Sequence, residues 1–91
     1  MSEEGAAHER IRVIWSPEAR SDLRAIDRAP AVEILHCIDR YLTSHSGDIK
    51  KLKAPLLGYR LRCGEYRIFF DAKDEMTIHV MAVRHRKDAY R

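Results

Sequence analysis

The most constraining feature of the sequence is the stretch 58–70, in which apolar and polar side chains alternate on both sides of Gly64. Alternation with a period of two places successive side chains on opposite faces of a strand, so the stretch predicts a β-hairpin. One face would carry the apolar set, namely Tyr59, Leu61, Cys63, Tyr66, Ile68 and Phe70. We expect this face to be buried and the opposite face, with Arg60, Arg62 and Arg67, to be exposed.

Three guanidinium groups on one small patch repel each other, which is tolerable in water or around a bound polyanion. The hairpin alone leaves both interpretations open. Its arginines could belong to a solvated sheet face, or they could bind phosphate groups.

The segments around the hairpin predict an α+β domain. Residues 11–15 favour a strand, and Ser16 followed by Pro17 is typical of a helix start. Apolar spacing predicts a second helix over residues 31–42, after a break at Ala29–Pro30. We therefore expect a small, antiparallel-rich sheet with an N-terminal helical hairpin packed on one face.

Residues 76–83 predict a further strand, which is apolar on both sides and so belongs inside the sheet. Strict alternation would put two sets of side chains on opposite faces: Met76, Ile78, Val80 and Ala82 on one, and Thr77, His79, Met81 and Val83 on the other.

A chain of 91 residues with 45% hydrophobic residues predicts one domain, here residues 11–91, after a polar, flexible leader at residues 1–10. No apolar run reaches the length of a membrane span. Cys37 and Cys63 stand singly within apolar patterns, which favours free buried thiols in a reducing cytoplasm over a disulfide or a metal site. We therefore expect a cytoplasmic protein.

Charge is divided unevenly along the chain. Residues 1–49 carry six arginines against nine acids, a net −3, whereas residues 50–91 carry eleven Lys or Arg against five acids, a net +6. A basic half is typical of proteins that meet phosphate-rich partners. Lys50, Lys51 and Lys53 could be a solvated loop or phosphate anchors, and the basic end of the chain at residues 84–91 could fray or fold over the sheet.

Four segments together resemble the RelE/ParE superfamily of bacterial and archaeal toxins. They are Trp15-Ser16-Pro17-Glu18-Ala19, Lys51-Leu52-Lys53, the segment from Gly58 to Arg67, and the closing segment from Val83 to Arg91. The resemblance covers residues 11 to 91. It implies a microbial-ribonuclease-like fold without disulfides, no cofactor, and a cognate antitoxin as the protein partner.

The superfamily contains two activities. RelE-like members cut mRNA in the ribosomal A site, whereas ParE-like members bind and poison DNA gyrase without catalytic basic residues. This sequence resembles the first branch. Arg60 and Arg62 lie where RelE has two lysines, Arg67 matches its sheet arginine, and Arg86 and Tyr90 match its C-terminal arginine and tyrosine. The spacing from Arg86 to Tyr90 is shorter than in RelE.

The resemblance thus implies a metal-independent endoribonuclease that inhibits translation, with the ribosome and mRNA as further partners and gyrase poisoning as the alternative. Its catalytic residues would be Arg60, Arg62, Arg67, Arg86 and Tyr90, and its RNA-binding residues Lys50, Lys51, Lys53, Arg84 and Lys87.

Cleavage of RNA without a metal requires the 2′-OH to attack the neighbouring phosphate. A base takes the hydroxyl proton, cations stabilise the phosphorane, and an acid protonates the leaving 5′-oxygen. Tyr90 becomes a better base when surrounded by arginines, because their charge favours the phenolate. Arginine is a poor acid, so His85 is the candidate for the leaving-group proton. His36, His45 and His79 are interpreted as stripe or loop residues, and none of them pairs with Asp or Glu at metal-ligand spacing.

Overall fold

The computed structural model describes residues 11–54 and 58–89. In chain order the elements are β1 (Arg12–Trp15), α2 (Pro17–Arg24), α3 (Arg28–Ser44), β2 (Asp48–Lys51), β3 (Tyr59–Cys63), β4 (Tyr66–Asp74) and β5 (Thr77–His85). The leader at residues 1–10 lies outside the described residues, as do Tyr90 and Arg91.

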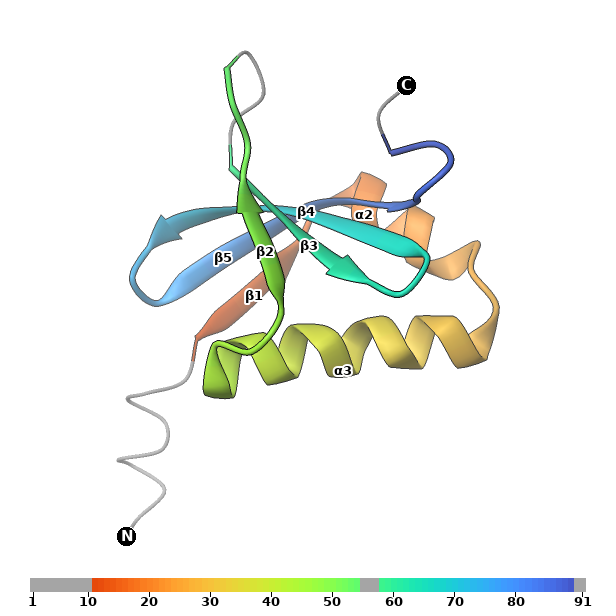
Figure 1. Cartoon of the computed structure of the whole chain (residues 1–91), viewed down its shortest axis with the longest axis horizontal. Coiled ribbons are helices and arrows are strands. Elements are labelled where there is room, and N and C mark those ends of the chain that lie inside the picture. The colour runs from red at the N-terminus through yellow and green to blue at the C-terminus, as the bar shows by residue number, and fades with distance from the viewer. Residues whose placement is uncertain (1–10, 55–57, 90–91) are drawn as a thin grey trace, which may run out of the picture.

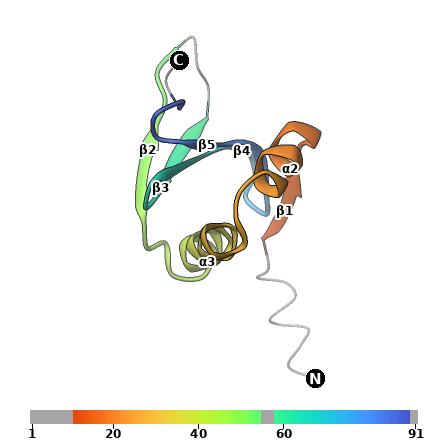
Figure 2. The same ribbon diagram turned by 90° about the vertical axis from the view of Figure 1, so that its right-hand side faces the viewer.

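The five strands form one mixed sheet in the order β1-β5-β4-β3-β2. All neighbouring pairs are antiparallel except β1 and β5, which run parallel with Arg12 opposite Thr77 and Trp15 opposite Val80. The sheet curves, with α3 on its inner side and α2 beside β1 (Figures 1 and 2). This is the predicted α+β arrangement, and the predicted internal position of the last strand is confirmed.

Local chemistry explains where the two helices begin. Ser16 caps α2, because its Oγ accepts a hydrogen bond from the Ala19 N–H at 3.0 Å, and Pro17 occupies the first helical position. The second helix begins at Arg28, three residues earlier than predicted, with Pro30 in its first turn. A proline is tolerated there because N–H groups of the first turn have no partner within the helix.

One hydrophobic core joins both helices to the inner face of the sheet. The helices contribute Ala19, Ile34 and Ile38, which are 0–6% exposed. The hairpin contributes the residues predicted for its buried face, of which Tyr66 and Tyr59 are only partly buried; the fully buried ones are Leu61, Cys63, Ile68 and Phe70. Burial of this set is the main favourable term in folding a domain of this size.

The predicted alternation of the last strand is wrong beyond Val80, because β5 contains an irregularity. Phe70 lies opposite Val80 while Phe69 lies opposite Ala82, so Met81 is an extra residue in β5. Such a bulge reverses the facing of every later residue in the strand. Val83 therefore joins the core at 3% exposed, and Arg84 turns to the outer face of the sheet, away from α3.

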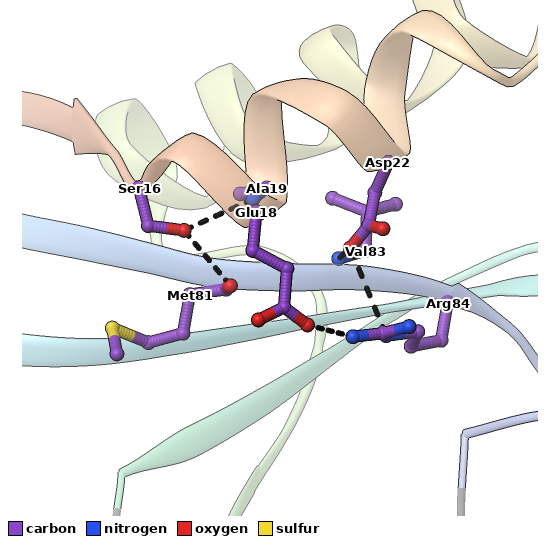
Figure 3. Close-up of polar contacts among 7 residues, drawn as sticks. All are labelled: Ser16, Glu18, Ala19, Asp22, Met81, Val83 and Arg84. Atoms are coloured by element: carbon purple, nitrogen blue, oxygen red, sulfur yellow. Dashed lines mark hydrogen bonds and ion pairs between the residues drawn. The ribbon is translucent and has the colours of Figure 1, made fainter.

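The bulge coincides with a change of neighbour along β5. Before it, β5 pairs with β1; after it, α2 takes the place of a strand. The Ser16 N–H donates to the Val80 carbonyl at 3.0 Å, and the Ser16 hydroxyl donates to the Met81 carbonyl at 2.9 Å. The Asp22 carboxylate accepts the Val83 N–H at 2.9 Å. The cap residue Ser16 and the Asp22 side chain of the helix thus satisfy backbone groups that a longer β1 would have paired (Figure 3).

Two sequence-based predictions require correction here. Residues 48–51 form the edge strand β2, whereas the sequence analysis predicted no strand there and considered Lys50 and Lys51 as part of a solvated loop or as phosphate anchors. Three of its four residues are charged, which hides the strand pattern, and only Ile49 contacts the core. The thiols are not free either, since Cys37 and Cys63 form a disulfide. Packing of α3 against β3 brings their Cα atoms to 6.2 Å, a proximity that a sequence separation of 26 conceals.

Candidate nucleic-acid interface

A row of three arginines crosses the outer face of the sheet. Arg62 in β3 lies directly opposite Arg67 in β4, and Arg67 lies directly opposite Arg84 in β5. Side chains at opposed positions share a face, and adjacent strands are about 4.8 Å apart, so the row spans roughly 10 Å at the backbone. The register confirms that Arg60, Arg62 and Arg67 share the face opposite the helices. We call Arg62, Arg67 and Arg84 the arginine row.

Arg67, at the centre of the row, is held by the turn of its own hairpin. Its Nη1 donates to the Gly64 carbonyl at 2.9 Å and to the Tyr66 carbonyl at 3.0 Å. The residue is 8% exposed, so the prediction of an exposed Arg67 is wrong. The cause is that the side chain folds back over the turn. Carbonyl partners leave the positive charge uncompensated, and they fix its position.

Asp48 in β2 lies at one end of the arginine row and pairs with the arginines there. Its two carboxylate oxygens lie 3.7 Å from Arg60 Nη2 and 3.8 Å from Arg62 Nη1. The two arginines differ in exposure, with 15% of the Arg60 side chain accessible against 57% for Arg62. Arg62 is therefore the member of this pair that can extend toward a ligand.

Two carboxylates from α2 close the row at the other end. Glu18 Oε2 accepts a hydrogen bond from Arg84 Nη2, and Asp22 Oδ2 lies 3.7 Å from Arg84 Nε (Figure 3). The Asp22 side chain is largely buried and also accepts the Val83 N–H, so its position is fixed from two sides. Among the described residues, carboxylates consequently compensate Arg84 but not Arg67 beside it. Because Arg60 and Arg62 share the one carboxylate of Asp48, positive charge remains at the centre of the row and at its β2 end.

Arg86 and His85 occupy the end of β5 nearest the hairpin turn. Arg86 Nε lies 2.7 Å from Glu65 Oε1, and the Arg86 N–H donates to the Glu65 carbonyl at 2.7 Å. His85 lies opposite Tyr66, with the two rings edge to face at 5.3 Å, so it faces away from the arginine row. Its Nδ1 accepts the Lys87 N–H at 3.2 Å, which leaves the proton of a neutral ring on Nε2.

The predicted lysines separate onto different surfaces. Lys50 lies opposite Arg60 and shares the face of the arginine row, whereas Lys51 lies opposite Tyr59 on the other face. Lys53 follows β2, and Lys87 lies in the exposed turn after β5. The structure therefore brings Lys50 together with Arg60, Arg62, Arg67 and Arg84, but not Lys51. Tyr90 lies outside the described residues.

Sequence reasoning missed the acidic residues of the site. Asp48, Glu18 and Asp22 fix the ends of the arginine row, and Glu65 fixes Arg86. Asp48–Ile49–Lys50 carries a faint signal, because its alternation could have indicated a strand facing the hairpin.

One group of residues within the described ranges has the composition of a metal site. The candidate ligand atoms of Glu33, Cys37 and Cys63 all lie within 4.8 Å of one another. The two sulfurs are bonded to each other, so neither is available as a thiolate ligand in this state.

The comparisons with known proteins agree on a toxin. Residues 13–90 match the sequence profile of the family described as ParE toxin of type II toxin-antitoxin system, parDE. The RelB-RelE antitoxin-toxin complex of Methanococcus jannaschii contains a chain that is 30% identical, with a TM-score of 0.67 over 85% of this chain and 94% of that chain. The RelBE2 complex of Mycobacterium tuberculosis contains a chain that is 26% identical, with a TM-score of 0.60 over 85% and 99%.

A more distant structure shares the fold alone. The YoeB dimer of Staphylococcus aureus is 22% identical, with a TM-score of 0.67 over 84% of this chain and 97% of that chain. No curated protein sequence matches the chain. Within the described residues, neither helix is long and apolar enough to cross a membrane.

A curved sheet that wraps one helix and carries a row of arginines on its outer face, together with these matches, defines a toxin of a type II toxin–antitoxin system. The chain belongs to the ParE toxin family, within the RelE/ParE superfamily that its sequence motifs resemble.

Proposed function

We propose that the chain is a ribosome-dependent endoribonuclease that cuts mRNA in the A site and acts in the cytoplasm. The observation that carries the proposal is Arg67, held at 8% exposure by two carbonyl oxygens between Arg62 and Arg84. A fixed guanidinium suits a charge that develops only in the transition state, because no reorganisation is needed when it forms. Its planar donors also match two phosphate oxygens.

In this mechanism the arginines perform the task that a metal performs in other nucleases. Arg67 stabilises the phosphorane, while Arg62, Arg60 and Arg86 orient the RNA backbone around it. Tyr90 is the base that takes the 2′-OH proton, and its phenolate is favoured by the surrounding positive charge. The leaving 5′-oxygen requires a proton donor, and His85 can supply one from Nε2 as an imidazolium, which requires that Nδ1 gain a proton and give up its hydrogen bond from the Lys87 N–H. His85 faces away from the arginine row, so the bound RNA must extend around the end of β5 for His85 to act as the acid.

Lys50 shares the face of the arginine row, whereas Lys51, Lys53 and Lys87 lie outside it. We assign Lys50 to the mRNA, and the other three to phosphates of ribosomal RNA. Phosphate anchors set affinity and its dependence on salt, not the chemical step.

A cognate antitoxin is the proposed protein partner. The relatives from M. jannaschii and M. tuberculosis were solved in toxin–antitoxin complexes. An antitoxin here would cover the arginine row or displace the chain from Arg84 onward. Co-expression with the adjacent open reading frame should abolish toxicity, and unchanged toxicity would contradict this part of the proposal.

The test of the mechanism is single-turnover cleavage of mRNA on programmed ribosomes with saturating toxin. Tyr90→Phe removes a proton acceptor with almost no contact area, so cleavage should fall about 10²–10⁴-fold while ribosome binding persists. The matched control is Lys51→Ala, which should weaken binding and its salt dependence but leave the single-turnover rate unchanged. Cleavage by Tyr90→Phe at the wild-type rate would exclude Tyr90 as the base.

The alternative is a toxin that binds and poisons DNA gyrase, and the match to the ParE profile favours it. Glu65 neutralises Arg86, and the two α2 carboxylates neutralise Arg84, so part of the basic surface is already paired. Such pairing is compatible with a surface that binds a protein and performs no chemistry. Mapping mRNA 5′ ends after induction separates the two functions. New 5′ ends support the nuclease, whereas DNA damage without them supports gyrase poisoning.

A further inference from the structure

The Cys37–Cys63 disulfide is exposed to solvent on one side only. Cys63, at the end of β3, is 4% exposed, whereas Cys37 on α3 is partly exposed and lines a small cavity. The cavity has a volume of about 120 Å³ and is lined by Cys37, Arg40, Ser46, Gly47, Leu61 and Arg62. A molecule that enters it meets the Cys37 sulfur first.

Both sulfurs have neighbours that suit the reduced state. Arg40 Nη2 lies 3.4 Å from Cys37 Sγ, a distance at which a guanidinium stabilises a thiolate. Cys63 Sγ lies 3.6 Å from the Glu33 carbonyl oxygen, which can accept the hydrogen bond of a buried thiol. In the disulfide, Arg40 Nη2 donates only a weak hydrogen bond to an uncharged Cys37 Sγ, and Cys63 has no proton to donate to the Glu33 carbonyl. The surroundings of the two cysteines therefore suit the reduced dithiol as well as the disulfide.

The cavity also indicates what kind of molecule it admits. A cavity of about 120 Å³ accommodates the thiol end of a small molecule. Arg40 and Arg62 line it, and Glu33 Oε2, 3.7 Å from Arg40 Nη2, offsets part of that charge. Asp48 lies 3.8 Å from Arg62 but is shared with Arg60, so three arginines face two carboxylates and positive charge remains. The balance favours an anionic ligand.

We propose that this cavity is a thiol-exchange site at which an anionic low-molecular-weight thiol opens the Cys37–Cys63 bond through Cys37. The thiolate attacks Cys37 Sγ, a mixed disulfide forms there, and Cys63 leaves as a thiolate that takes a proton from water. A second thiolate then attacks the small-molecule sulfur and releases Cys37 as a thiolate beside Arg40. Two small thiols are oxidised to one small disulfide, and the protein disulfide is reduced by the same two electrons.

The reaction changes what holds the hairpin turn. Cys63 stands between Arg62 and Gly64, whose carbonyl holds Arg67. The bond ties this turn covalently to α3, and reduction leaves it tied by packing alone. In a reducing compartment, disulfides are usually transient and redox-sensing, and a bond that a small thiol can open fits that pattern. The proposal does not depend on the nuclease activity, because the bond and the cavity exist whatever the outer face binds.

The experiment measures the rate at which the purified full chain is reduced by glutathione, which is anionic, and by cysteamine, which is cationic. Each rate is divided by the rate of the same thiol with a neutral reference disulfide. We expect the corrected rate to be about tenfold higher for glutathione and the difference to shrink in 1 M salt. Mass spectrometry should find the trapped glutathione adduct on Cys37.

Arg40→Gln removes the charge at the cavity while keeping an amide of similar length, and it should abolish most of the preference for glutathione. Arg24→Gln is the matched control, since it makes the same charge change outside this cavity and should leave the preference intact. Equal corrected rates for the two thiols in the wild type, or an adduct on Cys63, would overturn the proposal.

A metal site is the competing assignment for the reduced chain. Glu33, Cys37 and Cys63 would then bind Zn²⁺, and equimolar Zn²⁺ would protect both cysteines from alkylation. That result would overturn the proposal. We expect no such protection, because Arg40 lies against two of the three ligands. All of these readouts are chemical, so failure of the nuclease proposal would not affect them.

Discussion

The two faces of the β3–β4 hairpin are fixed by different means. On the inner face, Leu61 and Ile68 lie opposite each other and pack against α3, and the nearby disulfide ties the strand end to the same helix. On the outer face, Arg62 and Arg67 lie opposite each other and are positioned by Asp48 and by two carbonyl oxygens. The same backbone thus carries apolar contacts on one side and directional polar contacts on the other.

The difference separates stability from function within the hairpin. Leu61 and Ile68 serve stability, whereas Arg62 and Arg67, next to them in sequence, serve the proposed function. Apolar burial is nondirectional and contributes free energy in proportion to area, so the inner face sets the stability of the fold. Exposed ion pairs contribute little to stability, so loss of the pairs at Arg62 or Arg84 on the outer face should cost little. Substitutions on the two faces should therefore affect different measurements.

The largest expected effect on stability is that of Ile68→Ala. Ile68 is 1% exposed, and truncation of a buried isoleucine costs about 2–5 kcal/mol through lost burial and the cavity that remains. The control is Arg62→Ala on the neighbouring strand and opposite face, which should change stability by no more than about 0.5 kcal/mol. Urea denaturation of both variants measures the difference. Similar losses in the two variants would contradict the division between the faces.

The disulfide should contribute the next largest amount. Closing a loop between residues 26 positions apart removes conformational entropy from the unfolded chain, so reduction should lower the free energy of unfolding by about 3 kcal/mol. The urea midpoint of the wild type should fall on addition of reductant, and that of Cys37→Ala should not respond. A wild-type midpoint indifferent to reductant would mean that packing alone holds the hairpin to α3.

The smallest effects should come from the carboxylates beside Arg84. Asp22→Ala leaves the Val83 N–H without its acceptor and should cost about 1–2 kcal/mol, whereas Asp22→Asn keeps an acceptor and should cost less. Glu18→Gln removes only a solvent-exposed ion pair and should cost under about 1 kcal/mol, with the loss vanishing in high salt. Thermal unfolding at two salt concentrations distinguishes these variants. If Asp22→Asn lost as much stability as Asp22→Ala, the stabilisation would come from the charge of Asp22 and not from its hydrogen bond with the Val83 N–H.

Much of this arrangement could be predicted from local sequence, and the exceptions share a cause. Alternation in 58–70 predicted which hairpin residues share a face, because period two and the turn at Gly64 are local properties. The burial of Arg67, the facing of Arg84 and the pairing of Cys37 depend on contacts that local patterns do not contain. Met81 illustrates this. Nothing in its identity marks a bulge, which arises where β1 ends and Ser16 binds the Met81 carbonyl from 65 residues away.

The candidate site was predicted in the same uneven way. The sequence indicated the cations, because the arginines cluster in one part of it. The roles assigned to these arginines and to Tyr90 stay predictions. It did not indicate Asp48, Glu18 or Asp22 as their partners, because an acid on a predicted helix or loop is most simply a solvated residue. Only the register of β2 and the position of α2 give those acids their neighbours.

The parallel pairing of β1 with β5 has a consequence for the order of events during synthesis. β5 follows every other element in the chain, yet it lies between β1 and β4 and supplies Ile78, Val80 and Val83 to the core. The helices and the first four strands consequently cannot complete a core while β5 is still untranslated. We expect the nascent chain to stay unfolded until β5 has left the ribosome, so the arginine row, to which β5 contributes Arg84, is assembled only then.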